Sequence, residues 1–159
     1  MVSASDERFM RKAIEVAKKG IEAGQTPFGS CIVKGGRVVA ACHNTVWGTC
    51  DPTAHSEVNT VREACRKLKN IGLSGCTIYS TTEPCPMCFS ACHWAKVGRI
   101  VYGDGILDAQ SAGFNELTIS NRKMKWGGDS PVEIEGGVLR KECKELFEEW
   151  AKKRKCRTY

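Results

Sequence analysis

The sequence predicts an α/β domain in which helices flank both faces of a mixed sheet. Stretches with the apolar spacing of helices alternate along the chain with short β-prone runs. The first two of these runs are joined by Gly35-Gly36, a pair that favours a tight hairpin turn. A length of 159 residues suits one hydrophobic core, so a single domain is expected over residues 1–159.

The first half of the chain is predicted to open with an amphipathic helix. Apolar residues recur there at helical spacing, at Phe9, Ala13, Ile14, Ala17 and Ile21. A hairpin of strands 30–34 and 37–42 follows, and a polar loop over 44–53 then leads to a second helix that begins near His55. This antiparallel hairpin is the reason for expecting a mixed sheet.

The second half is predicted to alternate strands and helices. In chain order these are strand 76–80, helix 85–95, strand 99–102, helix 106–112, strand 132–135 and helix 142–153. The whole order is α-β-β-α-β-α-β-α-β-α, which gives five strands. Residues 121–130 are the one long segment expected to be an irregular loop, either a lid or an insertion.

The composition, with 42% hydrophobic and 26% charged residues, is typical of soluble globular proteins. No apolar stretch approaches the ~18 to 20 residues needed to cross a bilayer. Asp6 and Glu7 lie where a signal peptide would have its apolar core. A cytoplasmic protein without membrane contact is therefore expected, with most of its ten cysteines reduced.

A substantial share of the net charge of +6 lies near the C-terminal end of the sequence. Residues 152–155 are all basic, and Arg157 follows closely. Cations at a helix end complement the helix dipole without any partner. A solvated helix end is therefore favoured over a surface that binds nucleic acid.

Two short motifs carry the chemistry, and each lies at a predicted helix start. They are His55-Ser56-Glu57 and Pro84-Cys85-Pro86-Met87-Cys88. Helix N-termini favour thiolate over thiol, and the two prolines restrict the backbone so that both sulfurs can bind one ion. One His and two Cys are a recognised ligand set for catalytic zinc, which keeps its fourth position open.

Glu57 is predicted to transfer protons beside the metal, because it need not bind the ion itself. One alternative is a closed structural zinc site, with Cys50, Cys92 or His93 as the fourth ligand. Another is a redox-active Cys-x-x-Cys pair. The open site is favoured, since the first motif offers no second Cys and a redox pair leaves His55 and Glu57 without a shared purpose.

His-x-Glu with Pro-Cys-x-x-Cys is the signature of zinc-dependent base deaminases. The chain resembles the cytidine deaminase-like superfamily and, within it, the guanine deaminase branch. The resemblance runs through the segments 27–29, 51–58, 83–88, 112–114 and Tyr159. It implies a three-layer α/β/α fold with a five-stranded mixed sheet, and one Zn²⁺ per subunit held by His55, Cys85 and Cys88.

The same resemblance implies how a base is bound. Asn44 is expected to hydrogen-bond a purine ring, Phe28 to stack on it, Trp94 and Phe114 to wall the pocket, Glu116 to hold the base and Tyr159 to close the site. For the three pocket aromatics, Phe28, Trp94 and Phe114, plain core packing is the alternative, and for Asn44 it is a role in a turn.

The sequence departs from the guanine deaminase pattern at two positions. Ser56 stands where Ala is usual, and Glu116 is one methylene longer than the more familiar Asp. Either change can reshape the pocket. His43 and His93 lie near the expected cavity, but a lone His is more often a core or rim residue, so neither is assigned to the site.

The function expected from this resemblance is hydrolytic deamination of guanine to xanthine, with release of ammonia. Alternatives are a tRNA adenosine deaminase, or a deaminase of guanosine, adenine, cytosine or an aminotriazine. A non-enzymatic alternative is a zinc-stabilised module that binds RNA through residues 152–157. The resemblance also implies a homodimer, in which the C-terminal segment at about 138–159 is exchanged between subunits. Nucleic acid is not expected as a partner.

Overall fold

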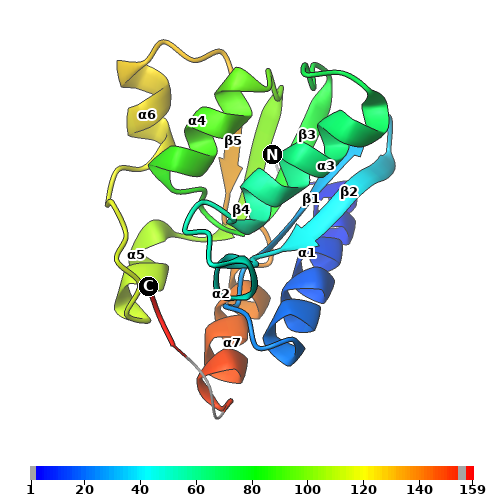
Figure 1. Ribbon diagram of the computed structural model, residues 1–159. Coiled ribbons are helices and arrows are strands. Elements are labelled where there is room, and N and C mark those ends of the chain that lie inside the picture. The colour runs from blue at the N-terminus through cyan, green and yellow to red at the C-terminus, as the bar shows by residue number, and fades with distance from the viewer. Residues whose placement is uncertain (1–2, 154–156) are drawn as a thin grey trace.

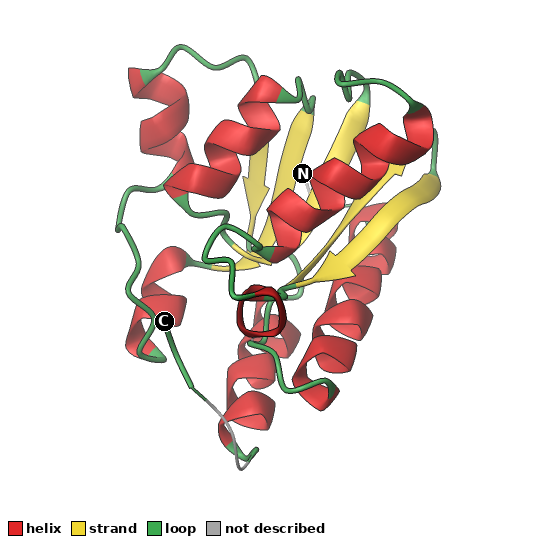
Figure 2. Ribbon diagram, viewed as in Figure 1, coloured by secondary structure: helices red, strands yellow, loops and turns green. Residues whose placement is uncertain are grey.

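A computed structural model describes residues 3–153 and 157–159 of the chain. A sheet forms the middle layer, and helices cover both of its faces (Figures 1 and 2). The five strands lie in the order β2-β1-β3-β4-β5. Strand β1 is antiparallel to both β2 and β3, whereas β3, β4 and β5 run parallel to one another. The predicted α/β fold with a five-stranded mixed sheet is therefore confirmed.

The elements follow the predicted order, with two additional short helices. The strands are β1 (Gly29–Lys34), β2 (Arg37–His43), β3 (Cys76–Thr82), β4 (Arg99–Asp104) and β5 (Glu133–Gly136). The helices are α1 (Ala4–Glu22), α2 (Val46–Thr49), α3 (Ser56–Leu68), α4 (Pro86–Trp94), α5 (Ile106–Ser111), α6 (Asn121–Gly127) and α7 (Arg140–Ala151).

Alternation along the strands divides the interior into two cores. Neighbouring residues of a strand point to opposite faces, so each buried strand supplies both cores. Under α1 and α7 the core contains Cys31, Tyr79, Val101, Leu146 and Trp150. Under α3 and α4 it contains Ile32, Ile78, Ile100, Ala64 and Phe89. Helices α3 and α4 therefore lie on one face of the sheet, and contacts between His55 and Cys85 bring their N-termini together.

Glycines allow two close arrangements in the first hairpin. Gly35 and Gly36 have φ angles of +54° and +73°, and Lys34 pairs with Arg37, so the predicted two-residue turn is present. At the other end of β1, a side chain on Gly29 would collide with the main chain of Ala13 and Ala17. Glycine there lets α1 pack directly on the sheet.

The prediction of an irregular loop over 121–130 is wrong, because α6 occupies most of that segment. The Ser120 side chain accepts from the Lys123 amide at the helix start. Asn121 is fully buried; its N–H donates to Glu83 Oε1 at 2.8 Å, and its side-chain amide donates to Pro84 O. These distant partners fix the helix, and the local sequence does not reveal them.

The predicted polar loop over 44–53 contains the short helix α2. Asn44 starts it, since its Oδ1 accepts from the Val46 amide at 3.0 Å. The side-chain amide of Asn59, on α3, donates to the oxygens of His43, Thr45 and Ala54 at 3.0–3.2 Å. This bridge fixes the loop that leads to His55.

Part of the basic C-terminal run is paired within the fold. Lys153 forms an ion pair of 2.6 Å with Glu22, and Arg157 lies over the ring of Trp47. Arg154 and Lys155 lie outside the described residues. The cysteines in the described part of the chain are all free thiols, as predicted for most of them. No helix in residues 3–153 and 157–159 is long and apolar enough to span a membrane.

A buried ion pair ties the start of α1 to the sheet. Asp6 is almost fully buried, and its carboxylate accepts from Arg99 at 2.7 Å and from the Tyr79 hydroxyl at 2.9 Å. It also forms a capping box with Ser3. Burial raises the pKa of Asp6, but the hydrogen bonds from Arg99, Ser3 and Tyr79 outweigh it and hold that pKa well below its usual range.

Replacing Asp6 by Asn should therefore destabilise the fold by about 3 kcal/mol at neutral pH, because Arg99 loses its buried counter-charge. A carboxyl with a depressed pKa stabilises the fold above its ordinary value of 3.8 and loses that contribution as the pH falls further. The gap between wild type and Asp6→Asn in urea unfolding should accordingly narrow below that pH.

Glu7→Gln is the matched control, since Glu7 makes an exposed pair with Arg11 on the same helix and should change stability by only about 0.5 kcal/mol or less. Equal stability of wild type and Asp6→Asn at neutral pH would contradict this role for Asp6.

Candidate metal centre and active site

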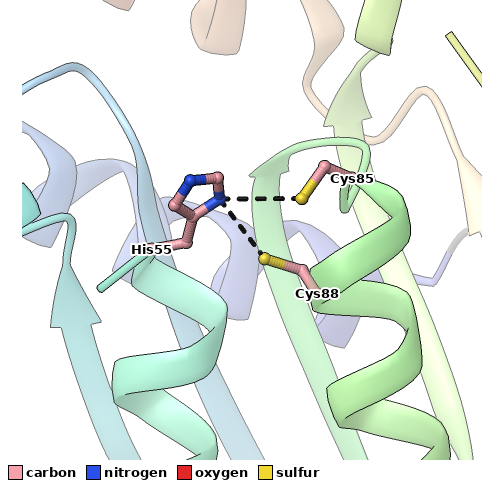
Figure 3. Close-up of side chains that lie close together, drawn as sticks. All are labelled: His55, Cys85 and Cys88. Carbon is pink, nitrogen blue, oxygen red and sulfur yellow. Dashed lines mark hydrogen bonds between the residues drawn. The ribbon is translucent and has the colours of Figure 1, made fainter. Parts of the chain in front are cut away.

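The N-termini of α3 and α4 meet at one edge of the sheet and present the predicted ligands. His55 is the residue that caps α3, and Cys85 is the residue that caps α4. Pro86 occupies the first turn of α4, where its missing N–H is not needed. Figure 3 shows the three side chains of His55, Cys85 and Cys88 pointing toward one another from the two helix starts.

The donor atoms of these side chains have the spacing that zinc requires. His55 Nδ1 lies 3.6 Å from Cys85 Sγ and 3.5 Å from Cys88 Sγ. In a tetrahedral site with a Zn–S bond of about 2.3 Å and a Zn–N bond of about 2.0 Å, nitrogen and sulfur are about 3.5 Å apart. The donor set and these two distances therefore fit a zinc ion.

The electrostatics of the cluster favour a bound cation. Contact with the Cys88 thiol lowers the pKa of Cys85 well below its usual range, although burial opposes this, and His55 adds to the effect. A thiolate is thus available even before a metal arrives. A divalent ion would displace the remaining thiol proton from Cys88, as metal binding to cysteine does generally.

The described residues supply no fourth ligand, so the closed structural site gains no support. Only His55, Cys85 and Cys88 cluster closely enough to hold an ion in that part of the chain. Cys92 is a buried neutral thiol whose pKa is raised by burial, and Cys50 is exposed. The ring of His93 is engaged elsewhere, 2.8 Å from Ser130 Oγ.

Two hydroxyl groups fix the carboxylate of Glu57 beside this cluster. Ser80 Oγ donates to Glu57 Oε1 at 2.9 Å, and Ser56 Oγ donates to Oε2 at 3.0 Å. Oε2 lies 3.5 Å from Cys88 Sγ, and Glu57 is buried, with an exposed fraction of 6%. Ser56, a departure from the family pattern, thus acts on Glu57 itself. Neither hydroxyl could be assigned from the sequence, because Ser80 belongs to a strand 23 residues away.

Aromatic rings form the wall of the pocket above the metal ligands. Phe28 packs edge-on against Phe114 with ring centroids 4.8 Å apart. The Tyr159 ring lies 5.7 Å from that of His55 and 5.6 Å from that of Phe114. Asn44 takes the alternative role in a turn, since its Oδ1 accepts from the Val46 amide, and its side-chain amide donates to Tyr159 Oη. The pocket is therefore capped by the last residue of the sequence.

Glu116 completes the cavity next to the metal ligands. It lines a space of about 20 Å³ together with Phe28, Glu57, Thr82, Glu83, His55 and Cys85. Burial, and then the negative charge on Cys85, raise the pKa of Glu116 to about 7. Near neutral pH this side chain can therefore donate a hydrogen bond as well as accept one.

Trp94 does not reach this pocket. The prediction that it forms part of the pocket wall is therefore wrong within one chain. It ends α4, about 13 Å along the helix from Cys85, and is 82% exposed. There it lines a separate cavity with His93, Lys96 and Pro131. The remaining predicted site residues do gather around the cluster.

A family model described as cytidine and deoxycytidylate deaminase zinc-binding region matches residues 3–104. The guanine deaminase of Bacillus subtilis is 41% identical over 114 residues, which cover 71% of this chain and 73% of that protein. The tRNA-specific adenosine deaminase of Aquifex aeolicus is 37% identical over 126 residues, covering 76% and 82%. A solved structure of guanine deaminase from Nitrosomonas europaea superposes with a TM-score of 0.85 at 26% identity, covering 94% of this chain and 86% of that one.

The region matched by the family model contains His55, Glu57, Cys85 and Cys88, which are the residues that converge in space. Sequence and geometry therefore agree on the same four side chains. The chain belongs to the zinc-binding cytidine and deoxycytidylate deaminase family and is a zinc-dependent hydrolase of C–N bonds.

Proposed function

We propose that the protein deaminates a free purine base and that guanine is this base, converted to xanthine with release of ammonia. The observation that carries the proposal is the position of Tyr159, which packs over His55 and Phe114 and caps the pocket. A capped pocket suits a small planar molecule. The similarity to guanine deaminases supports the same choice.

When bound, zinc lowers the pKa of water from 15.7 toward about 7 and so supplies the nucleophile at neutral pH. The chain's own residues then manage protons and position. The carboxylate of Glu57 takes one proton from water and passes it to a ring nitrogen; it then takes the second proton from the oxygen newly bonded to carbon and gives it to the leaving amine. A C–O bond forms, the C–N bond breaks, and nitrogen leaves as ammonia.

Recognition of the base is assigned to the groups that line the pocket. Phe28 and Phe114 offer ring faces and edges for packing, and Glu116 can both donate to and accept from a purine edge near pH 7. Asn44 is the amide proposed to bond the ring. Its side-chain N–H currently reaches Tyr159 Oη, so substrate and tyrosine would share this donor.

A tRNA adenosine deaminase is the second candidate, favoured by the similarity to the Aquifex aeolicus enzyme. Such an enzyme must admit a flipped nucleotide with chain on both sides. Tyr159, which packs against His55 and accepts from Asn44, would have to move aside for such a chain. Guanosine, adenine, cytosine and aminotriazines remain further candidates. The non-catalytic RNA-binding module loses its basis, because the buried Glu57 beside the ligands serves no purpose in it.

We retain the prediction of a homodimer with an exchanged C-terminal segment. In the structure this segment closes the site of its own chain, through Tyr159 and Arg157. The same contacts can be made between two chains if the segment crosses to a partner. Sizing of the zinc-loaded protein tests the homodimer.

Ammonia release from a panel of substrates tests the proposed function. The zinc-loaded protein is incubated with guanine, guanosine, adenine, cytosine, the aminotriazine ammeline and a tRNA that contains adenosine. Guanine should give the highest kcat/KM, with xanthine as product. Turnover of the tRNA alone would reject the proposal in favour of the second candidate.

Glu57→Gln provides the control for that panel. The amide keeps the size of the side chain but cannot take a proton, so kcat should fall by about 10²- to 10⁴-fold. The zinc content should stay the same, because Glu57 is not a ligand. Turnover at the wild-type rate by the zinc-loaded variant would show that the base lies elsewhere.

Ser80→Ala should lower kcat about tenfold with little effect on KM, because one carboxylate oxygen of Glu57 loses its hydroxyl donor. Steady-state kinetics with guanine measure both constants. Ser111→Ala is the matched control, since Ser111 is exposed on α5 and its hydroxyl donates to Leu107 O within the same helix. An unchanged kcat in Ser80→Ala would mean that Glu57 is held by other contacts.

A further inference from the structure

We propose that Trp47 and Arg157 form a latch that holds the C-terminal segment over the metal ligands and so excludes substrates larger than a free base. The proposal deepens the proposed function, since it names what limits substrate size at the same site. Both residues lie outside the catalytic motifs. They meet in space across 110 residues of sequence.

Trp47 contacts both the side chain and the main chain of Arg157. The guanidinium carbon of Arg157 lies 3.7 Å from the centroid of the Trp47 ring, which is a cation–π contact. The indole N–H donates to Arg157 O at 3.2 Å. Two different contacts to one residue fix the position of the segment as well as its attachment.

These contacts place Tyr159, which lies two residues further along the chain, at the pocket. Tyr159 is then held from two sides, because Asn44 donates to its hydroxyl and the Asn115 amide donates to its main-chain oxygen at 3.1 Å. Its ring also contacts that of Trp47, with centroids 6.3 Å apart. Asn44 and Trp47 lie only three residues apart in the sequence. This short segment therefore holds both Tyr159 and Arg157.

With Tyr159 docked, the space beside Glu57 is too small for a substrate. The cavity beside Glu57 and the ligands measures about 20 Å³, which is enough for about one water but not for a purine. A second cavity, of about 320 Å³, is lined by the ligands His55 and Cys85 and by Tyr159, which forms part of its wall. A base in this cavity therefore lies against Tyr159, and a shift of Tyr159 that lets the base approach Glu57 also releases the Asn44 amide.

The strength of the latch then sets how far the segment opens. A planar base needs only a shift of Tyr159, after which the segment can close over it and exclude water. A nucleoside carries a ribose that keeps the segment open, so its turnover requires the latch to break. Weakening the latch removes that cost for guanosine much more than for guanine.

The test compares kcat/KM for guanosine and for guanine in wild type, Trp47→Ala, Arg157→Ala and the double variant, all loaded with zinc. Trp47→Ala should raise the guanosine-to-guanine ratio about tenfold, and Arg157→Ala should raise it less, because the bond from the indole to the main-chain oxygen remains. The double variant should add little to Trp47→Ala, since that change already removes both contacts. Trp47→Phe and Arg157→Lys, which keep a ring and a cation, should restore part of the selectivity.

Trp126→Ala is the matched control for removal of a surface tryptophan, because Trp126 is 92% exposed on α6. Lys152→Ala is the control for removal of a C-terminal cation. Neither should move the ratio. An unchanged ratio in Trp47→Ala and Arg157→Ala, or effects that add fully in the double variant, would overturn the latch.

Amide hydrogen exchange at Asn115 separates the latch from the proposed function, because it needs no substrate. The Asn115 N–H is protected only while Tyr159 is docked. Exchange should be about tenfold faster in Trp47→Ala than in wild type, with a smaller increase in Arg157→Ala. Faster exchange in a protein that does not act on guanine would keep the latch and reject the substrate, whereas unchanged exchange would reject the latch whatever the substrate.

Discussion

The constraint on which the site depends is the meeting of two helix N-termini at one edge of the sheet. Helices α3 and α4 pack on the same face over a shared core, and each presents its capping residue, His55 or Cys85, to the same point. The free backbone N–H groups and the dipoles of both helices favour negative charge there. Thiolates and a carboxylate can therefore be buried together, and a cation balances them.

The geometry of catalysis and the selection of substrate have different physical origins in this fold. The ligands and Glu57 are fixed by helix starts, by two prolines and by the Ser56 and Ser80 hydroxyls, all of which belong to the rigid layers. The cap over the pocket depends on contacts between segments that are far apart in sequence. Substrate range can thus change through the tail while the chemistry stays constant.

The sequence was sufficient for the metal site because its determinants are local. Spacing within two short motifs, and their position at helix starts, predicted that His55, Cys85 and Cys88 would converge. Prediction failed at α6, because its start is set by distant contacts with Glu83 and Pro84. Trp94 was placed in the pocket wall by the resemblance alone, and the helix carries it about 13 Å from Cys85. The partnership of Trp47 and Arg157 leaves no local pattern, apart from an aromatic residue in a polar loop.

X-ray absorption at the zinc edge of the loaded protein tests the central claim most directly, because it counts the ligands that the two helix starts supply. The account predicts two sulfur atoms at about 2.3 Å and two nitrogen or oxygen atoms at about 2.0–2.1 Å, one of them from His55 and one from solvent. Three or four sulfur atoms would contradict it, since the ion would then be closed off by another cysteine and Glu57 would have no reactant beside it.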